Sequence, residues 1–274
     1  MNRIAIKFGY LGSDFHGYVF DEHHETVEGE ILKRLIKYNV ISSKKENRFV
    51  SASRTDRSVS AVGHVVAFDT SFNAEPVLRI LNSTKKMVFF YGWKYVSENF
   101  NPRKALSRVY RYYLPLTENT NIEKLEKAAS LFLGEHDFKY FCSDSNNQTN
   151  TIREIKKIDI QITDKFAIID ITAQSFLYHM VRKIVSAIQR VAESKNSYED
   201  IIATLNKNRS NTFGMANPEN LILMGVNYSF EFEVYESLNL RLMEKLQSQL
   251  HKTYVLQNFL KSVVEASQVV SRKS

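Results

Sequence analysis

One carboxylate stands out by its surroundings, Asp56 in the loop SASRTDRSVS (residues 51–60). The apolar, β-branched residues 61–68 that follow predict a buried strand, which would hold the loop in a defined place. An acid between two arginines, Arg54 and Arg57, suits a catalytic carboxylate held by cations. A surface hairpin turn explains the same residues, because Asp and Ser favour turns by hydrogen-bonding their own backbone. Taken alone, so short a motif favours the turn.

A cation in an apolar setting is the second feature. Arg182 lies in FLYHMVRKIVSAI (residues 176–188), where the apolar residues recur on one face of a predicted helix. A guanidinium on such a face must either reach water along its own stem or pair with an acid. Reaching water is the commoner outcome, so this residue alone does not identify a site.

A basic and aromatic segment is the third feature. NPRKALSRVYRYYL (residues 101–114) has no acidic residue and contains three tyrosines, one of them Tyr110. Its cations are Arg103, Lys104, Arg108 and Arg111. Because cations neutralise phosphates and aromatic faces stack on unpaired bases, the mixture suits single-stranded or looped RNA. An ordinary strand with a solvated basic face accounts for it equally well.

Composition narrows the class of protein. The 274 residues carry a formal net charge of +7, which favours an acidic partner such as nucleic acid or a membrane surface. The single cysteine, Cys142, excludes an internal disulfide and a cysteine-cluster metal site, and the seven histidines are scattered, so we expect no metal. No stretch predicts a signal peptide or a membrane span, so we expect a soluble, cytoplasmic protein without a membrane partner.

The pattern of apolar residues gives the order of elements. In the first half it predicts strands at residues 4–8, 49–52, 61–68 and 87–96, and helices at residues 27–38 and 76–81. In the second half it predicts strands at residues 109–114, 155–162, 166–173 and 221–230. Thr26 is the expected cap of the first helix, and Thr120 with Glu123 predicts a capping box for a helix that ends near Gly134. Two further helices are expected, one along the apolar stripe of residues 177–191 and one starting at Ser197.

Each half therefore shows a βαββαβ order. This order predicts the α+β class, with two ferredoxin-like (RRM-like) domains, residues 1–104 and 105–233, each a mainly antiparallel sheet with helices on one side. Two such sheets placed edge to edge would leave a central cleft able to bind RNA. Residues 234–274 contain neither Gly nor Pro and carry Leu at every fourth position from 238 to 250, which predicts a helical tail of one long helix or a helical pair.

Five stretches, in order along residues 3–230, resemble the TruA family of tRNA pseudouridine synthases. SRTDRSVSA (residues 53–61) is similar to the family motif GRTDAGVHA. The other stretches are GSDFHG with TVEG (residues 12–17 and 26–29), FNPRKALSRVYRY (residues 100–112), FLGEHDF (residues 132–138) and YHMVRKIVS (residues 178–186). Five motifs together are far more specific than any one of them.

The resemblance implies isomerisation of uridine to pseudouridine at positions 38–40 of the tRNA anticodon stem-loop, without metal or organic cofactor. By the same resemblance Asp56 matches the essential aspartate, Tyr110 the active-site tyrosine, Arg182 the partner of the aspartate, and Arg54 the arginine associated with flipping the target nucleotide. The resemblance also implies a homodimer. We expect the remaining cations of the cleft to bind RNA, namely Arg57, Arg103, Lys104, Arg108 and Arg111.

The chain also departs from the family motif. Ser58 stands where a glycine would allow positive φ, Ser60 replaces a histidine and Arg57 an alanine, and Tyr18-Val19 stand where Trp-Gln is common in the bacterial form. These changes resemble archaeal and eukaryotic relatives. They leave two alternatives open: a related synthase acting on other tRNA uridines, and a non-catalytic RNA-binding protein that recognises stems through a basic cleft.

Overall fold

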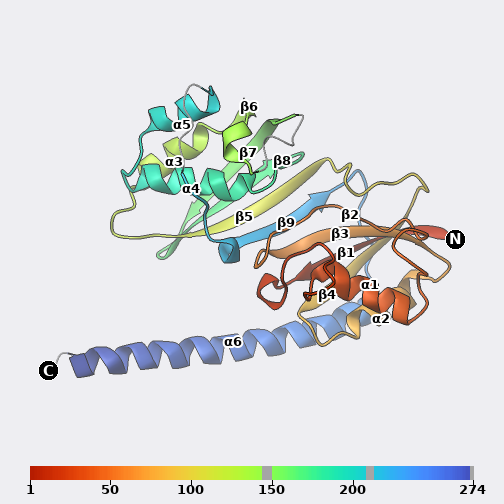
Figure 1. Cartoon of the computed structure of the whole chain (residues 1–274). Helices are drawn as coiled ribbons and strands as arrows, with labels where there is room; N and C mark the ends of the chain where they lie inside the picture. The colour runs from red at the N-terminus through yellow and green to blue at the C-terminus, as the bar shows by residue number, and fades with distance from the viewer. Residues whose placement is uncertain (144–149, 208–212, 272–274) are drawn as a thin grey trace. The chain divides into compact units, whose positions relative to one another are not determined.

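The computed structural model describes residues 1–143, 150–207 and 213–271, with side chains as far as residue 263. Its strands are β1 (Asn2–Tyr10), β2 (Val50–Ser51), β3 (Ser60–Thr70), β4 (Val88–Val96), β5 (Ser107–Pro115), β6 (Gly134–Asp137), β7 (Ile152–Ile162), β8 (Phe166–Ala173) and β9 (Leu221–Asn227) (Figure 1). Its helices are α1 (Val27–Lys37), α2 (Ala74–Asn82), α3 (Ile122–Ser130), α4 (Met180–Ala192), α5 (Tyr198–Leu205) and α6 (Glu236–Ser271). The 3₁₀ turns are η1 (Gly12–Asp14), η2 (Lys139–Phe141) and η4 (Pro218–Asn220).

One sheet runs through both halves of the chain. Among the described residues its strand order is β4-β1-β3-β9-β5-β8-β7-β6, with β2 pairing β3 outside this path. Every pairing is antiparallel except that of β3 with β9, so the expected mainly antiparallel sheet is confirmed. The helices gather in two groups, α1 with α2 beside β4 and α3 with α4 beside β7 and β5 (Figure 1).

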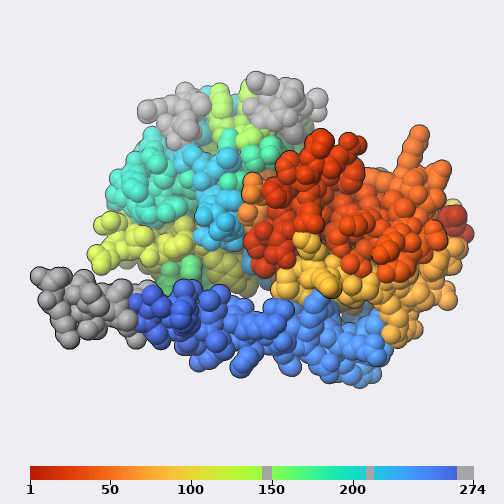
Figure 2. Space-filling view, turned by 60° about the horizontal axis from the view of Figure 1, so that its bottom comes forward, coloured from red at the N-terminus to blue at the C-terminus, as the bar shows by residue number. Residues whose placement is uncertain are grey.

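The last strand joins the two halves. We expected two separate sheets placed edge to edge, but β9 pairs with β5 on one side and with β3 on the other. The β3 pairing is short, matching Ser60 to Ile222 and Ala61 to Leu223. Figure 2 shows the two halves in direct contact, the red to orange residues beside the green to light blue ones. The division into ferredoxin-like domains at residues 104 and 105 stays a prediction, while the contacts along the chain separate residues 1–232 from 233–274.

A glycine permits this junction. A Cβ built on Gly63 in β3 would lie 2.6 Å from the carbonyl oxygen of Met224 and 2.9 Å from Cα of Gly225, both in β9. Real Cβ atoms do not approach backbone so closely, and neither contact atom can rotate away. Gly63 therefore lets the two strands come close enough to share one sheet.

Helix caps agree with the sequence in two places and differ in one. Thr26 caps α1, its hydroxyl accepting from the Gly29 amide, and Ser197 caps α5 in a capping box. The capping box predicted from Thr120 and Glu123 is wrong. Asn121 is the cap of α3 and accepts from the Lys124 amide, so the helix begins one residue later than predicted, and the Thr120 hydroxyl bonds Thr117 instead.

The segment after α3 also differs from the prediction. The helix ends at Ser130, and residues 134–137 form the short strand β6 at the edge of the sheet. The sequence GEHD gave no strand signal because it is polar and begins with glycine. Gly134 has a φ of 89°, which fits its place as the turn into the strand.

The residues after 232 form a separate unit. The predicted tail is one helix, α6, and residues 272–274 of the predicted tail lie outside the described part. Within the described residues every helix is too short or too polar to cross a membrane.

Substituting Ala for Gly63 should loosen the junction between β3 and β9. We expect a loss of about 1–3 kcal/mol in the free energy of unfolding, because the added Cβ must push backbone apart in a packed sheet. Gly225→Ala is the matched control, since its Cβ would make only an ordinary contact at 3.6 Å with Asn227. Urea unfolding of both variants measures the difference. Equal stability of the two would contradict a role for Gly63 at the junction.

Candidate active site

The loop that carries Asp56 packs against the segment around Gly12, which follows β1. A Cβ on Gly12 would lie 2.4 Å from the carbonyl of Val59, so only glycine allows the two loops to pack together. Tyr18 donates its amide to the Thr55 carbonyl at 3.2 Å, and the Tyr10 hydroxyl lies 2.7 Å from Thr55 Oγ1. Thr55 thus ties the loop to β1 through its hydroxyl and to the segment after β1 through its carbonyl.

Two of the departures from the family motif, Ser58 and Ser60, lie in the turn that follows Asp56. Ser58 adopts φ 68°, the left-handed conformation that glycine would have taken more easily. Ser60 uses its hydroxyl to accept a hydrogen bond from the Gly12 amide at 2.9 Å. Ser60 therefore ties this turn to Gly12, and Ser58 takes the left-handed position where the family motif has glycine.

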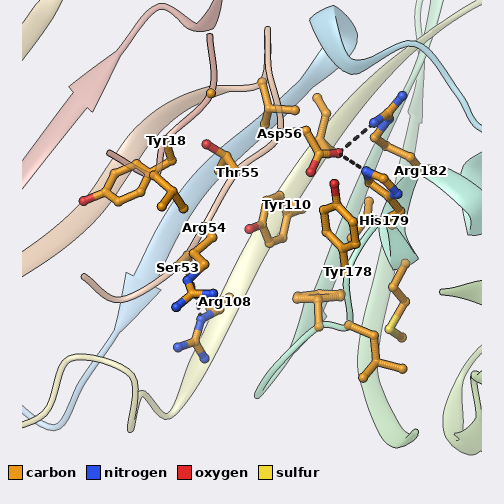
Figure 3. A pocket seen from close by; sticks show the side chains of 18 of the residues that line it. Tyr18, Ser53, Arg54, Thr55, Asp56, Arg108, Tyr110, Tyr178, His179 and Arg182 are labelled. Atoms are coloured by element: carbon orange, nitrogen blue, oxygen red, sulfur yellow. Dashed lines mark hydrogen bonds and ion pairs between the residues drawn. The ribbon is translucent and has the colours of Figure 1, made fainter. Parts of the chain in front are cut away.

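Asp56 and Arg182 form an ion pair. Arg182 Nη1 lies 2.7 Å from Asp56 Oδ2, and the two side chains are 11% and 17% exposed (Figure 3). Arg182 pairs with the acid, the less common of the two outcomes that the sequence left open. The pair spans 126 positions of sequence, from a loop of the first half to a helix of the second.

The first turn of α4 delivers this arginine. Arg182 Nε donates to the Ala216 carbonyl at 2.8 Å, and the Ala216 amide donates back to the Arg182 carbonyl at 3.1 Å. The guanidinium is therefore held at both Nε and Nη1, which fixes its plane against the carboxylate.

Tyr110 lies beside the pair on β5. It is 7% exposed, and its ring meets Phe176 edge to face at 5.1 Å between centroids. Burial raises the pKa of the Tyr110 hydroxyl to about 12, with Asp56 adding to the rise and Arg108 and Ser53 opposing it. Because the pKa is raised, the phenol keeps its proton throughout the neutral range and acts there as a hydrogen-bond donor.

These groups line one pocket of about 860 Å³. Its wall is formed by the Asp56 loop, Tyr110 of β5 and the start of α4 (Figure 3). Of the residues predicted from sequence it contains Arg54, Asp56, Arg57, Arg103, Arg108, Tyr110 and Arg182. The acid, the aromatic ring and the cations expected of the site are thus brought together.

Two of the predicted RNA-binding residues lie elsewhere. Arg111 is one position along β5 from Tyr110, so its side chain is on the opposite face of the sheet, where it forms a two-bond ion pair with Asp170 of β8. Lys104 lines a different pocket, beside Phe100 and Tyr228. Neither residue contributes to the pocket around Asp56.

Arg108 has a different task from the one we predicted. It is 6% exposed, and its guanidinium donates to the hydroxyl of Ser53 and to three carbonyl oxygens, those of Ala52, Arg103 and Gln174. With Nε, Nη1 and Nη2 all bonded within the protein, it ties three segments around the pocket. The basic and aromatic pattern could not separate such an internal arginine from one that binds phosphate.

The sequence reading missed His179. Its Nε2 lies 3.3 Å from Asp56 Oδ2, and its ring stacks on Tyr178 at 3.7 Å between centroids. His179 precedes Arg182 by three residues in the stretch YHMVRKIVS, so its spacing on the same turn could have indicated it. In the described part of the chain, no three His, Cys, Asp or Glu side chains gather as metal ligands would.

Comparison with known proteins agrees with the motifs. A family model described as tRNA pseudouridine synthase matches residues 128–229. The chain is 36% identical over 267 residues to tRNA pseudouridine synthase A of Thermococcus sibiricus, covering 95% of this chain and 100% of that one. It is 39% identical over 239 residues to the Methanococcoides burtonii protein of the same name (85% and 86% covered), and 36% identical over 267 residues to that of Pyrococcus furiosus (96% of each).

Among solved structures, a chain of a Cbf5-Nop10-Gar1 complex matches over 70% of this chain and 54% of that one, with 14% identity. Its TM-score of 0.36 is too low to carry an argument. In this chain the pocket brings together a carboxylate held by an arginine, an aromatic ring and further cations. The chain belongs to the TruA-type tRNA pseudouridine synthases, a family of isomerases with archaeal members among its relatives.

Replacing Arg108 by Lys should destabilise the protein. An ammonium group cannot reach all four oxygens that the guanidinium now bonds, so buried carbonyls lose their donor, and we expect a loss of about 2 kcal/mol. Arg111→Lys is the control, because its partly exposed pair with Asp170 is worth less than about 1 kcal/mol. Urea unfolding compares the two, and a loss no greater for Arg108→Lys than for the control would contradict the internal role.

Proposed function

We propose that the chain converts uridine to pseudouridine at positions 38–40 of the tRNA anticodon stem-loop, with Asp56 as the catalytic residue and no cofactor. The single observation that carries this proposal is the ion pair of Asp56 with Arg182, inside a pocket shared with Tyr110. The guanidinium sets a positive charge beside the carboxylate, and the pocket keeps the pair from full contact with solvent.

The reaction requires such a carboxylate. The bond from C1′ of the ribose to N1 of uracil breaks, and a bond from C1′ to C5 forms after the base turns. C5 loses its proton and N1 gains one, so the overall change is an isomerisation without oxidant or reductant. Positive character develops on the sugar, and an ionised Asp56 either attacks C1′ or acts as a base on the sugar.

Tyr110 is placed to hold the detached base. Its ring forms a buried aromatic surface with Phe176, on which a uracil can stack while it turns. Its hydroxyl carries a proton at neutral pH, so it can donate a hydrogen bond to a uracil carbonyl.

The exposed cations at the pocket suit the RNA backbone. Arg54, Arg57 and Arg103 line the pocket with exposed side chains. A paired nucleotide must turn out of its stem to reach Asp56, and Arg54, two residues before the acid, can fill the vacated space or hold a phosphate. Arg57 and Arg103 then neutralise flanking phosphates.

The choice of positions 38–40 rests on the motifs and on relatives named tRNA pseudouridine synthase A. The same family likeness supports our proposal of a homodimer acting in the cytoplasm. A related synthase for other tRNA uridines is the alternative, because Asp56 would serve it unchanged. A purely electrostatic RNA binder gains nothing from an acid on the surface that meets RNA, so the position of Asp56 favours an enzyme.

Asp56→Asn should abolish catalysis while leaving tRNA binding intact. The amide keeps the shape of the carboxylate but carries no charge for C1′, so release of tritium from C5-labelled uridine in tRNA should fall at least 1000-fold. Asp170→Asn, which alters an acid on the other face of the sheet, is the matched control and should keep activity near wild type. An active Asp56→Asn protein would falsify the catalytic assignment. Activity that disappears with EDTA would contradict the absence of a metal.

The positions modified can be read directly from cellular tRNA. In cells that lack this protein, pseudouridine should disappear at positions 38–40 and remain elsewhere, when mapped at single-nucleotide resolution. Reintroduction of the wild-type gene restores the modification, and the Asp56→Asn gene serves as the inactive control. Loss at other uridines with 38–40 unchanged would support the related synthase instead.

A further inference from the structure

His179 is a second group on the Asp56 carboxylate and has no task in the reaction described above. Its Nε2 lies 3.3 Å from Oδ2, the oxygen that Arg182 contacts at 2.7 Å (Figure 3). Among the described residues, no hydrogen bond or ion pair reaches the other oxygen, Oδ1. Both contacts are made to the same oxygen, which leaves the second one free for a substrate.

The partners of the imidazole decide where its proton lies. The contact of Nε2 with Asp56 is 3.3 Å long, and an ionised carboxylate only accepts hydrogen bonds, so a hydrogen bond formed there has its proton on Nε2. Nδ1 lies 2.8 Å from the Ser143 hydroxyl, which can donate to it when the ring is neutral. The neutral ring with its proton on Nε2 therefore satisfies both contacts at once.

The charges around the ring favour this neutral form. Burial lowers the pKa of His179 most, and the cations Arg182 and Lys183 on α4 lower it further, while Asp56 raises it. The net direction is below the ordinary value for histidine. The ring also faces Tyr178, which is stacked on it, and the pocket beyond holds the titratable groups Arg54, Arg57 and Tyr110.

The backbone at His179 has an unusual conformation that the surrounding contacts hold in place. The residue has φ 63° and ψ 2°, a left-handed conformation, immediately before the first residue of α4. The Ser143 amide donates to the Tyr178 carbonyl at 3.0 Å, which fixes the peptide that enters this turn. Left-handed backbone costs an L-residue roughly 1–2 kcal/mol, so it persists where surrounding contacts require it.

We infer that His179 is a positioning residue: its neutral imidazole donates from Nε2 to Asp56 Oδ2 and, together with Arg182, orients the carboxylate so that Oδ1 meets the ribose. This inference rests on the proposed catalytic role of Asp56. The ring takes no part in bond making, and its contribution is to the rate of the chemical step and not to tRNA affinity.

Two substitutions separate this role from a role in the backbone alone. Asn accepts left-handed backbone readily, but its amide is too short to reach Asp56. Gln adopts that backbone less readily, but its amide nitrogen stands close to the place of Nε2 and can donate to the carboxylate. If backbone conformation is the only task, His179→Asn should be the better enzyme; if hydrogen bonding is the task, His179→Gln should be.

We expect His179→Asn to lower the single-turnover rate with labelled tRNA about tenfold, with tRNA affinity within about twofold of wild type. His179→Gln should stay within about threefold of the wild-type rate, although it is the less thermally stable of the two. His136→Phe, at the distant edge strand β6, controls for loss of a histidine elsewhere. An Asn variant as fast as wild type, or a Gln variant as slow as Asn, overturns the inference.

The pH profile is a readout that a purely structural residue would not change. In the wild-type enzyme, protonation of His179 sets a full positive charge against Asp56, so the rate falls as the pH falls through the lowered pKa of the ring. Gln does not titrate, so its profile should fall only at lower pH. Coincident profiles contradict the inference, and this comparison decides the matter even if His179→Asn does not fold.

Failure of this inference can be distinguished from failure of the proposed function. If Asp56→Asn is inactive while His179→Asn has the wild-type rate and profile, only the role of His179 is wrong. If Asp56→Asn is active, the catalytic assignment itself is wrong, and the role of His179 fails with it.

Discussion

The ion pair between Asp56 and Arg182 is the contact on which the rest of the site depends. Each charge is largely withdrawn from water, so each would be costly without the other. Because they come from different halves of the chain, the halves must meet within hydrogen-bonding distance. The shared strand β9 and the close approach at Gly63 meet that requirement, because they join the two halves in one continuous sheet. Two separate sheets that only touched could slide past each other.

The arginines of the pocket are divided among three tasks, which net charge alone does not reveal. Arg182 pairs with the Asp56 carboxylate, and Arg108 supplies donors to the backbone around the pocket. Arg54, Arg57 and Arg103 keep their charge at the surface of the pocket, where a polyanion can reach it. Under the proposed function, an RNA meets the exposed cations first and the buried ion pair within, an order that suits capture of the backbone followed by placement of one nucleotide.

Much of this could be predicted from sequence, for reasons that also show where prediction ends. Periodic apolar residues located α1 and α4 well, because burial of one helix face leaves a strong pattern. The placement of β9 could not be predicted, since its pairing with β3 rests on two residue pairs far apart in the chain. Motifs brought Asp56, Tyr110 and Arg182 together, whereas composition could not assign Arg108 to the interior or Arg111 to the other face.

Two residues with left-handed backbone, Ser58 and His179, lie close in sequence to the two members of the ion pair. Ser58 lies two residues after the acid, and His179 lies three residues before the cation. Neither is glycine, so each conformation costs free energy that local contacts must offset. Around Ser58 those contacts come from Gly12 and Ser60, and around His179 from Ser143 and the carboxylate itself. Turns held this way have few alternative conformations, so the carboxylate is oriented before substrate arrives and the chemical step need not supply that ordering.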